Sequence, residues 1–509
     1  MKGYAYRMAP ALPLLSRPGD YIDGRFQTAP RPDGELLVRG PADVRELVSA
    51  HDYAVGQVDA AVAAARAAFP GFRKLGTEAR AELLRRYQAR LRAHREEIAL
   101  AIALEVGKPL WEAVTEVDAM AGKVDLSLGE GARFTAGAAL ANLPGEIRYR
   151  PLGVVAVVGP FNFPGHLPNG QIVPALLLGN CVVHKPSEKT PSAAVWIARC
   201  MDEAGFPKGA FNLVQGPGES GARLTTHADV DAVLFTGSVS VGRRIARDNA
   251  DRIERLIALE LGGKNAAIVL SDCDLERTAR AIAFAAFATA GQRCSSTSRV
   301  IASEEIAPRL LERLAEIAGG LRVGYPLEAD VFMGPVISEA ARNQLVDAQT
   351  RARAAGFEPV VAGGAVELAG REGFYVRPAI HRAPAGAPAV PGYSDDELFG
   401  PDLAFYTAPD LEAALALANR SRFGLTASVF TGSRAAFERA AEELDVGVLN
   451  WNRASAGASG RLPFGGVKQS GNHRPAGILA GAACAYAQGV MLSPEPDPGP
   501  LPVWPGMAL

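Results

Sequence analysis

The stretch "GVVAVVG", residues 153–159, decides the fold class of this chain. Its apolar residues follow one another without polar alternation, which predicts a strand covered on both faces. A helical segment follows at "PNGQIVPALLLG" (168–179), and "CVVHK" (181–185) is the next apolar run. Strands that alternate with helices in this way predict a parallel, doubly wound α/β sheet.

Further helical segments and strand-like runs are predicted on both sides of this stretch. Helices are predicted over "VDAAVAAARAAF" (58–69) and from Thr77 to about Val106, whereas residues 1 to about 55 read as irregular with short strand-like pieces. The proline-rich end, 493–509, reads as an extended tail. Later strand-like runs are "FNLVQG" (211–216), "DAVLFTG" (231–237) and "NAAIVLSD" (265–272), and a second α/β series spans about 275 to 450.

The bulk composition argues against several classes of partner. The 509 residues carry a net charge of −2, which gives no electrostatic reason to expect a nucleic acid or a membrane surface. The five cysteines form no CxxC pair and the seven histidines show no metal-ligand spacing, so neither disulfides nor a metal site are predicted. The N-terminus is a poor signal peptide and no apolar run reaches membrane-spanning length, so the cytoplasm is the expected location.

Cys294 stands in "ATAGQRCSSTSRV" (288–300), among residues too small and polar to build a core. Taken alone, it is either a small buried hydrophobe, as most free cysteines are, or a reactive thiol. Backbone N–H groups at such a turn, and a cation such as Arg293, would favour the nucleophilic thiolate. Cys294 is therefore a candidate nucleophile.

Two further segments offer groups for catalysis. Glu260, in "ALELGGKN" (258–265), precedes a glycine pair and is either a solvated glutamate or a general base whose pKa is raised in an apolar cleft. Asn162, in "GPFNFPGHLPNG" (159–170), follows a strand at the sheet edge where ligands of α/β folds bind. Its amide can donate to a developing oxyanion, with a solvated loop as the alternative.

Two loops are candidates for binding a nucleotide. In "LFTGSVSVGRRIA" (234–246) a strand leads into a Gly-rich turn that opens a helix, an arrangement that offers N–H groups to a phosphate. It is not the GxGxxG fingerprint, and a plain tight turn is the alternative. In "HKPSEKTP" (184–191), Lys185 and Glu188 can both reach a ribose or remain solvated.

Taken together and in this order, the segments resemble the aldehyde dehydrogenase superfamily. The resemblance covers nearly the whole chain, and it implies an α/β enzyme that oxidises an aldehyde to a carboxylic acid with a nicotinamide cofactor. The further segments that carry it are "DYIDGRF" (20–26), "DELFGPDLAFY" (396–406), "NRSRFGLTASVFTG" (419–432), "LPFGGVKQSG" (462–471) and "SGNHRPAG" (470–477).

The resemblance implies three catalytic roles. Cys294 would add to the aldehyde carbon, and the side chain of Asn162 together with the Cys294 N–H would hold the oxyanion of the thiohemiacetal. Hydride transfer to the nicotinamide would leave a thioester, and Glu260 would activate the water that hydrolyses it.

The resemblance also implies a cofactor site. Lys185 and Glu188 would contact the adenosine ribose, and Glu397 the nicotinamide ribose. A carboxylate beside the 2′-hydroxyl would repel a 2′-phosphate, so NAD is expected over NADP. The loop expected beside the pyrophosphate comprises Gly237, Ser238, Val239, Ser240, Val241 and Gly242.

Three segments look most like N-succinylglutamate 5-semialdehyde dehydrogenases of bacterial arginine catabolism: residues 159–180, "NWNRASAGA" (450–458) and "SGNHRPAG". This implies oxidation of N-succinyl-L-glutamate 5-semialdehyde to N-succinyl-L-glutamate. Two places depart from that subfamily, "CSSTSR" after the nucleophile and Lys264 in "LELGGKN". Cations that would suit the substrate carboxylates, unless they are solvated or in subunit contacts, are Arg453, Arg461, His473 and Arg474.

Other functions stay open at this point. The chain can act on another semialdehyde or on an aliphatic aldehyde, or use Cys294 as an esterase nucleophile. A coenzyme-A-acylating enzyme would lack a hydrolytic glutamate at the Glu260 position, and a non-enzymatic relative would be expected to lose the thiol or the glutamate. The presence of both residues argues against these two alternatives.

The resemblance further implies the domain organisation. Residues 20–135 and 155–260 would form a Rossmann-type NAD-binding domain, and residues 261–450 an α/β catalytic domain. Residues 136–154 and 475–495 would form a strand arm that pairs between subunits, giving a homodimer or a tetramer. Residues 1–19 and 496–509 would be extended termini.

Overall fold

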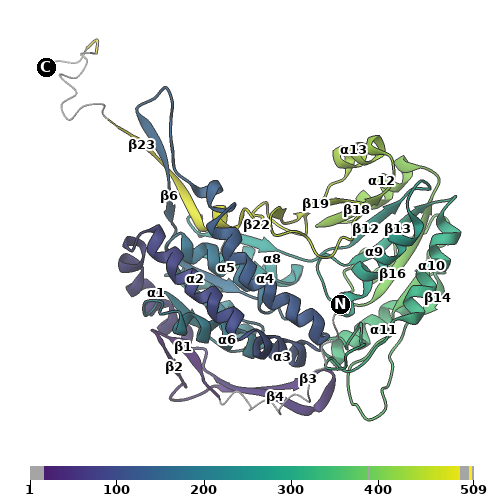
Figure 1. Cartoon of the computed structure of the whole chain (residues 1–509), viewed down its shortest axis with the longest axis horizontal. Coiled ribbons are helices and arrows are strands. Elements are labelled where there is room, and N and C mark those ends of the chain that lie inside the picture. Colours follow the sequence, from purple (N-terminus) through teal and green to yellow (C-terminus); the bar gives the residue numbers. More distant parts are fainter. Residues whose placement is uncertain (1–16, 388, 493–503, 507–509) are drawn as a thin grey trace.

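Two seven-stranded sheets, each covered by helices, form the two halves of the molecule (Figure 1). The structure is a computed structural model that describes residues 17–387, 389–492 and 504–506. Most of the segments expected to form extended termini, 1–19 and 496–509, lie outside the described residues. The sheets confirm the predicted α/β class, with parallel strands at the centre of each.

The first sheet has the order β11-β10-β7-β8-β9-β1-β2, and its strands from β11 to β9 are parallel. The apolar run at 154–158 is the middle strand of the parallel part, which explains why it lacks polar alternation. The strands are β7 (Val154–Val158), β8 (Cys181–Lys185), β9 (Phe211–Leu213), β10 (Ala232–Thr236) and β11 (Leu256–Glu260), with an antiparallel edge of β1 (Asp20–Ile22) and β2 (Arg25–Gln27).

Helices cover both faces of this sheet. The chain leaves β7 toward β8 on one side and later returns to place β10 on the other side of β7, so the strand order reverses between β7 and β10. With right-handed crossovers, α5 and α6 cover one face of the sheet, and α1 and α7 cover the other. A second layer, made of α2, α3 and α4, packs over α5 and α6. The bounds are α1 (Gln57–Lys74), α2 (Thr77–Ala93), α3 (Arg95–Val106), α4 (Leu110–Leu128), α5 (His166–Leu177), α6 (Pro191–Glu203), α7 (Gly218–Thr226) and α8 (Val239–Asp248).

Two local predictions need correction. The helix predicted from Thr77 to Val106 is two helices, because His94 leaves helical geometry between α2 and α3; α3 ends at Gly107, whose φ of 82° closes it. The segment up to residue 55 was predicted to be irregular with short strand-like pieces, and the piece at 20–26 is confirmed as β1 and β2. The segment also contains the longer antiparallel pair β3 (Gly34–Gly40) and β4 (Asp43–Tyr53), which was not predicted. Pro30 and Pro32 precede β3, and Pro41 lies in the turn between the two strands, so these prolines do not interrupt the pairing.

The second sheet has the order β14-β15-β16-β13-β12-β18-β19. Separate apolar clusters line its two faces, and the run at 265–269, β12, belongs to this sheet. Its parallel strands are β12 (Asn265–Val269), β13 (Thr297–Ser303), β15 (Ala379–Arg382), β16 (Asp402–Ala408), β18 (Thr426–Phe430) and β19 (Val448–Trp451), with β14 (Glu358–Ala362) antiparallel at the edge. Its helices are α9 (Leu275–Phe287), α10 (Ala307–Gly320), α11 (Glu339–Ala354), α12 (Leu411–Asn419) and α13 (Arg434–Glu443).

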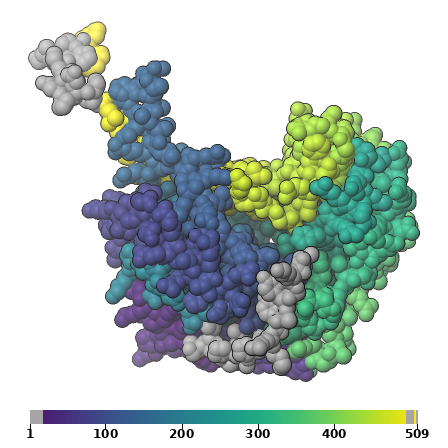
Figure 2. Space-filling model, viewed as in Figure 1, coloured from purple at the N-terminus to yellow at the C-terminus, as the bar shows by residue number. Residues whose placement is uncertain are grey.

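A three-stranded sheet, ordered β23-β6-β5, projects from the first half of the molecule (Figures 1 and 2). It joins β5 (Ala138–Ala139) and β6 (Gly145–Pro151) to β23 (Ala485–Met491), from near the C-terminal end. Short pairs and turns make up the remaining elements: β17 (Phe423–Gly424) with β21 (Val467–Lys468), β20 (Pro463–Phe464) with β22 (Ala476–Gly477), and the 3-10 turns η1 (Ala132–Thr135), η2 (Ala288–Gly291) and η3 (Ala480–Cys484).

The segment from 452 to 484 crosses back from the second half to the first, seen in yellow between them in Figure 2. There it bonds to the end of β11: the Leu261 N–H donates to the Ser470 carbonyl, and the Leu259 N–H to Asn472 Oδ1. Among the described residues, none of the helices is long and apolar enough to cross a membrane.

Candidate active site

A cleft of about 570 Å³ opens at the carboxyl ends of β7 and β10, where the strand order reverses. This is the position at which open α/β sheets bind ligands. Asn162, Lys185, Glu188, Glu260 and Cys294 all line it, together with Glu397 from the second half. Residues far apart in the sequence therefore face one cavity.

Cys294 follows the turn η2 and precedes β13, on the second half of the molecule. The turn is unusual, because Thr289, Ala290 and Gly291 all have left-handed backbones, with φ of 56°, 53° and 67°. Such a conformation costs a residue with a Cβ about 1–2 kcal/mol, so contacts elsewhere must hold Thr289 and Ala290 in place. On the other side of the cysteine, Asn265 Nδ2 donates to the carbonyls of Cys294 and Ser296, both at 2.8 Å.

The electrostatics of Cys294 differ from what the sequence suggested. Burial, together with the carboxylates of Glu397 and Glu260, raises the pKa of the thiol to about 12. Arg293 does not face the sulfur as a free cation, since its guanidinium is 2.7 Å from a carboxylate oxygen of Glu112. The cysteine is thus a protonated thiol at neutral pH in this state, and it needs a base or a cationic ligand to ionise.

Glu260 ends β11 and is buried, with 6% of its surface exposed. One carboxylate oxygen, Oε2, has no hydrogen-bond partner in the described part of the chain. Burial raises the pKa of Glu260 well above its ordinary value. Glu260 lines the cleft, and its raised pKa makes its carboxylate a stronger base than that of an ordinary glutamate. It is therefore suited to accept a proton near neutral pH.

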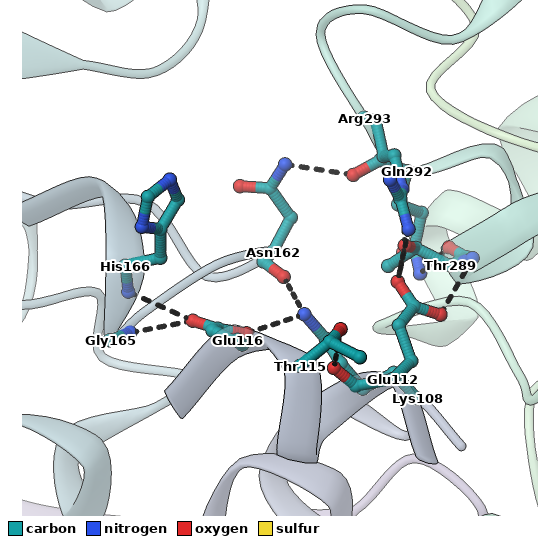
Figure 3. A network of polar contacts seen from close by, with 10 residues as sticks. All are labelled: Lys108, Glu112, Thr115, Glu116, Asn162, Gly165, His166, Thr289, Gln292 and Arg293. Atoms are coloured by element: carbon teal, nitrogen blue, oxygen red, sulfur yellow. Dashed lines mark hydrogen bonds and ion pairs between the residues drawn. The ribbon is translucent and has the colours of Figure 1, made fainter. Parts of the chain in front are cut away.

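Asn162 lies in the loop between β7 and α5 and is buried. Its Nδ2 donates to the carbonyl of Gln292 at 2.8 Å, so it directly joins the β7–α5 loop to the loop that carries Cys294 (Figure 3). Its own backbone carbonyl accepts from Lys108 Nζ at 2.5 Å. The amide nitrogen carries a second N–H, which can donate to a bound ligand while the bond to Gln292 stays in place.

The cofactor residues inferred from the sequence lie in the outer part of the cleft. Lys185, at the end of β8, is buried and 3.7 Å from a carboxylate oxygen of the half-exposed Glu188. Gly237, Ser238 and Val241 line the cleft, and Ser238 caps the N-terminus of α8. Val239, Ser240 and Gly242 are not among the lining residues; Gly242 packs so closely on Leu261 that a Cβ would clash with it.

Glu397 meets the linker between β11 and β12. Its Oε1 accepts a hydrogen bond from the Gly263 N–H at 2.9 Å, and burial raises its pKa to about 7. Gly262 lies so close that a Cβ there would overlap the Glu397 carboxylate. The glycine pair after Glu260 thus allows two acidic residues to share the cleft.

A second pocket, of about 180 Å³, reaches Cys294 from the opposite side. Asn162, Glu260 and Cys294 line both cavities, so these three residues lie where the two meet. Besides Arg293, the second pocket is lined by Lys123 and His166, which sequence reasoning missed. Lys123 is buried and donates to the Gly477 carbonyl at 2.6 Å, and no described carboxylate is among the groups that shift its pKa.

The structure does not bring the predicted substrate cations to this pocket. Arg453, Arg461 and His473 are not among its lining residues, and all three are exposed. Arg461 forms an ion pair with Glu130, and the exposed Arg474 donates to the carbonyl of His473. These side chains were inferred from their place in motifs, and motif position does not indicate the direction of a side chain.

The two departures from the subfamily pattern have different consequences. Ser295 lines the second pocket, and its carbonyl accepts a hydrogen bond from Ser455 Oγ at 2.7 Å. Lys264 points away from both pockets: it is buried against Tyr393 and donates to that residue's carbonyl at 2.7 Å. Only the first departure therefore touches the candidate site.

The family of the chain follows from its similarity to known proteins. The sequence profile described as "Aldehyde dehydrogenase family" matches residues 29–488, which is most of the chain. The chain belongs to the aldehyde dehydrogenase family. It is an oxidoreductase that acts on the aldehyde group, and the superfamily and fold predicted from the sequence are confirmed.

Individual members of the family are similar over nearly the full length. An N-succinylglutamate 5-semialdehyde dehydrogenase of Chromobacterium violaceum is 42% identical over 92% of this chain and 95% of its own. The crystal structure of an NAD-dependent aldehyde dehydrogenase from Sinorhizobium meliloti superposes with a TM-score of 0.90 at 31% identity, covering 96% of both chains. A Pseudomonas syringae aldehyde dehydrogenase solved with NAD+ and octanal gives 0.87 at 30% identity, covering 93% of this chain and 96% of its own.

Proposed function

We propose that this aldehyde dehydrogenase oxidises N-succinyl-L-glutamate 5-semialdehyde to N-succinyl-L-glutamate with NAD, as a step of arginine catabolism. Two things support this substrate: the name carried by the relative from Chromobacterium violaceum, and the charge of the pocket beside Cys294. The substrate carries two carboxylates besides the aldehyde. Lys123 lines that pocket, and no carboxylate of the described residues is among the groups that shift its pKa. Burial lowers the pKa of His166, which also lines the pocket, so Lys123 rather than His166 supplies the positive charge.

The main support for the substrate assignment is that Lys123, a buried cation, lines the second pocket. A buried ammonium group without a counter-ion is costly, and here burial lowers the pKa of Lys123 to about 8. A carboxylate that enters the pocket would supply the missing charge and favour the protonated amine. Glu260 is the one acidic residue among those lining the pocket, and its raised pKa reduces its negative charge.

The proposed chemistry assigns a role to each of Asn162, Glu260 and Cys294, which line both cavities. The Cys294 sulfur adds to the aldehyde carbon, and its proton leaves to a nearby base such as Glu260. The carbonyl oxygen becomes an oxyanion, to which the Cys294 N–H and the second N–H of Asn162 Nδ2 donate while the first N–H keeps its bond to Gln292. A bound nicotinamide serves as the acceptor of the hydride from this carbon. Glu260 then loses the thiol proton to solvent and deprotonates the water that attacks the thioester. As the acid leaves, Glu260 returns this second proton to the sulfur, which restores the Cys294 thiol.

The outer cleft fits a dinucleotide in its chemistry. Lys185 and Glu188 offer a cation and a carboxylate for ribose hydroxyls, and the N-terminus of α8 offers N–H groups for a phosphate. Glu397 would hold the nicotinamide ribose. We assign NAD rather than NADP because the Glu188 carboxylate would repel a 2′-phosphate. Initial rates measured with each cofactor test this preference.

A steady-state panel tests the substrate. The compounds are succinylglutamate, succinate and glutamate semialdehydes and simple alkyl aldehydes, and we expect the first to have the highest kcat/KM. Lys123→Met should lower kcat/KM for the dicarboxylate about 10- to 100-fold, the range of one charged hydrogen bond, with little change for alkyl aldehydes. Lys74→Met, at an exposed position, is the control. An alkyl aldehyde as the best substrate of the unaltered enzyme would contradict the assignment.

We also infer that the sheet β23-β6-β5 pairs with a second copy of the chain. It projects from the body, and several large apolar side chains are exposed on it. A monomer would leave these side chains and the free strand edges in water. The exposed residues are Leu140, Leu143, Ile147, Tyr486 and Met491.

A further inference from the structure

Helix α4 carries two buried glutamates one turn apart, Glu112 and Glu116, which face different loops of the active site (Figure 3). Positions four apart lie on one face of a helix, so both carboxylates project from the same side of α4. Neither residue lines the cofactor cleft or the second pocket. Their contacts are with the polypeptide around Asn162 and Cys294, rather than with a ligand.

Glu112 holds the loop that carries the nucleophile. Its carboxylate accepts the backbone N–H of Thr289 at 3.1 Å, the Thr289 hydroxyl, and the Arg293 guanidinium at 2.7 Å. Thr289 begins the left-handed run 289–291, and Arg293 directly precedes Cys294. One carboxylate therefore fastens the segment at both ends, across a backbone that residues with a Cβ rarely adopt.

The guanidinium of Arg293 is further fixed by two aromatic rings. It lies 5.1 Å from the ring centre of Phe163 and 5.6 Å from that of Phe284. Phe163 is the neighbour of Asn162 in sequence, so the two loops share this contact. An arginine committed to Glu112 and to two rings positions the backbone of Cys294 and does not act as its counter-ion.

Glu116 holds the other loop. Its carboxylate accepts the N–H groups of Gly165 at 2.9 Å and His166 at 3.0 Å, and its ion pair with Lys108 measures 2.8 Å. Lys108 Nζ in turn donates to the Asn162 carbonyl at 2.5 Å. The ion pair is fully buried, and every contact of Glu116 leads to the loop 162–166.

We propose that Glu112 and Glu116 are positioning residues that set the distance between Cys294 and Asn162 from one rigid helix. Glu112 fixes the sulfur and the Cys294 N–H, and Glu116 fixes the amide of Asn162, so the thiol and the oxyanion donors are aligned before substrate binds. This inference rests on the catalytic roles proposed for Cys294 and Asn162. It does not depend on which aldehyde is the substrate.

The two glutamates should then affect different measurements. Alkylation of Cys294 by iodoacetamide requires the thiol but no oxyanion donor, and mass spectrometry of its peptide separates it from the other four cysteines. The burst of NADH in a single turnover requires both. Glu112→Gln should slow both processes about 10- to 100-fold, whereas Glu116→Gln should slow the burst by the same factor and leave alkylation within about twofold. The Kd of NAD should stay within about twofold in both.

Controls distinguish positioning from a loss of fold. Asp125→Asn makes the same carboxyl-to-amide change at an exposed position of α4 and should change neither rate. Glu112→Met combined with Arg293→Met removes the buried pair without leaving an isolated charge, so it should fold and still lose the burst. Cys294→Ser should abolish alkylation at that peptide and the burst; a burst that persists would refute the proposed function itself.

Several outcomes would overturn the inference. Wild-type alkylation and burst rates in Glu112→Gln or in the double methionine variant would show that the loop keeps its geometry without Glu112. Equal slowing of alkylation by Glu112→Gln and Glu116→Gln, or a parallel loss of NAD affinity, would indicate a general loss of structure. Failure of both Glu112 variants to fold would place the residue in folding rather than in positioning.

Discussion

Glu260 faces two cavities with one carboxylate oxygen left without a partner in the described chain, and burial raises its pKa. Those facts together make it the strongest candidate for the base that activates water. A raised pKa means that the carboxyl is still protonated at a pH where an ordinary glutamate has ionised. The fraction of ionised base therefore increases as the pH rises through the raised value.

This gives a prediction for the hydrolytic step. The rate of thioester hydrolysis should increase with pH until Glu260 is ionised and then level off, which a pH profile of single-turnover hydrolysis measures. Glu260→Gln should give a burst of about one NADH per site and then stall, because the acyl group stays on Cys294. Cys294→Ser serves as the control without a burst but with NAD bound. Full turnover in the glutamine variant would remove Glu260 from the mechanism.

Sequence motifs were sufficient to predict that Cys294, Glu260 and Asn162 share one site, but they did not predict which groups surround these residues. Arg293 was expected to favour the thiolate, and it is paired with Glu112 instead. That pair joins residues 181 positions apart, so no local pattern could predict it. One signal was present: Glu112 and Glu116 fall at helical spacing among the apolar residues Ala113, Val117 and Met120, on a face where an unpaired charge would be costly.

At the scale of elements, the linker of residues 261–264 joins the two sheets and passes directly beside the active site. Gly262 packs against Glu397, and Gly263 donates to it, so the linker also positions a residue of the second half. Neither glycine has a positive φ, so close approach explains them: the Glu397 carboxylate lies against Gly262, and the Cys294 carbonyl and the Asn265 side chain lie against Gly263.

Gly262→Ala should therefore displace Glu397. We expect the KM for NAD to rise about tenfold or more, as for the loss of a charged hydrogen bond, and the free energy of unfolding to fall by about 1–3 kcal/mol through overpacking. Gly71→Ala, in α1 with open space around it, is the matched control and should stabilise the protein slightly. A wild-type KM for NAD in Gly262→Ala would contradict the role of Glu397 in cofactor binding.

The elements themselves were predictable where local signals were strong. Uninterrupted Val and Ile runs identified the central parallel strands, and Gly107 identified the end of α3. The break at His94 carries no glycine or proline and was missed. The pair β3 and β4 was missed because its sequence neighbours are rich in proline, although the prolines fall outside the strands. Pairing between strands is a tertiary contact, which a single-sequence pattern does not contain.

At the scale of the whole molecule, the projecting sheet determines the expected assembly. Ile147→Arg places a charge in the middle of its exposed apolar surface, and we expect the homo-oligomer to dissociate to smaller species, measured by light scattering after gel filtration. Ile253→Arg, at an equally apolar but far more exposed position away from that sheet, is the control. An unchanged molar mass in Ile147→Arg would mean that this sheet does not form the interface.

The return of residues 452–484 to the first half of the molecule has a consequence for synthesis. Leu261, directly after β11, donates to the Ser470 carbonyl, and Phe464 and Ala476 line the second pocket, so one wall of the site comes from residues late in the sequence. A ribosome will have translated both sheets before it reaches these codons. The active site around Cys294 is therefore completed only near the end of translation. A premature stop before Ala476 should yield a protein without dehydrogenase activity.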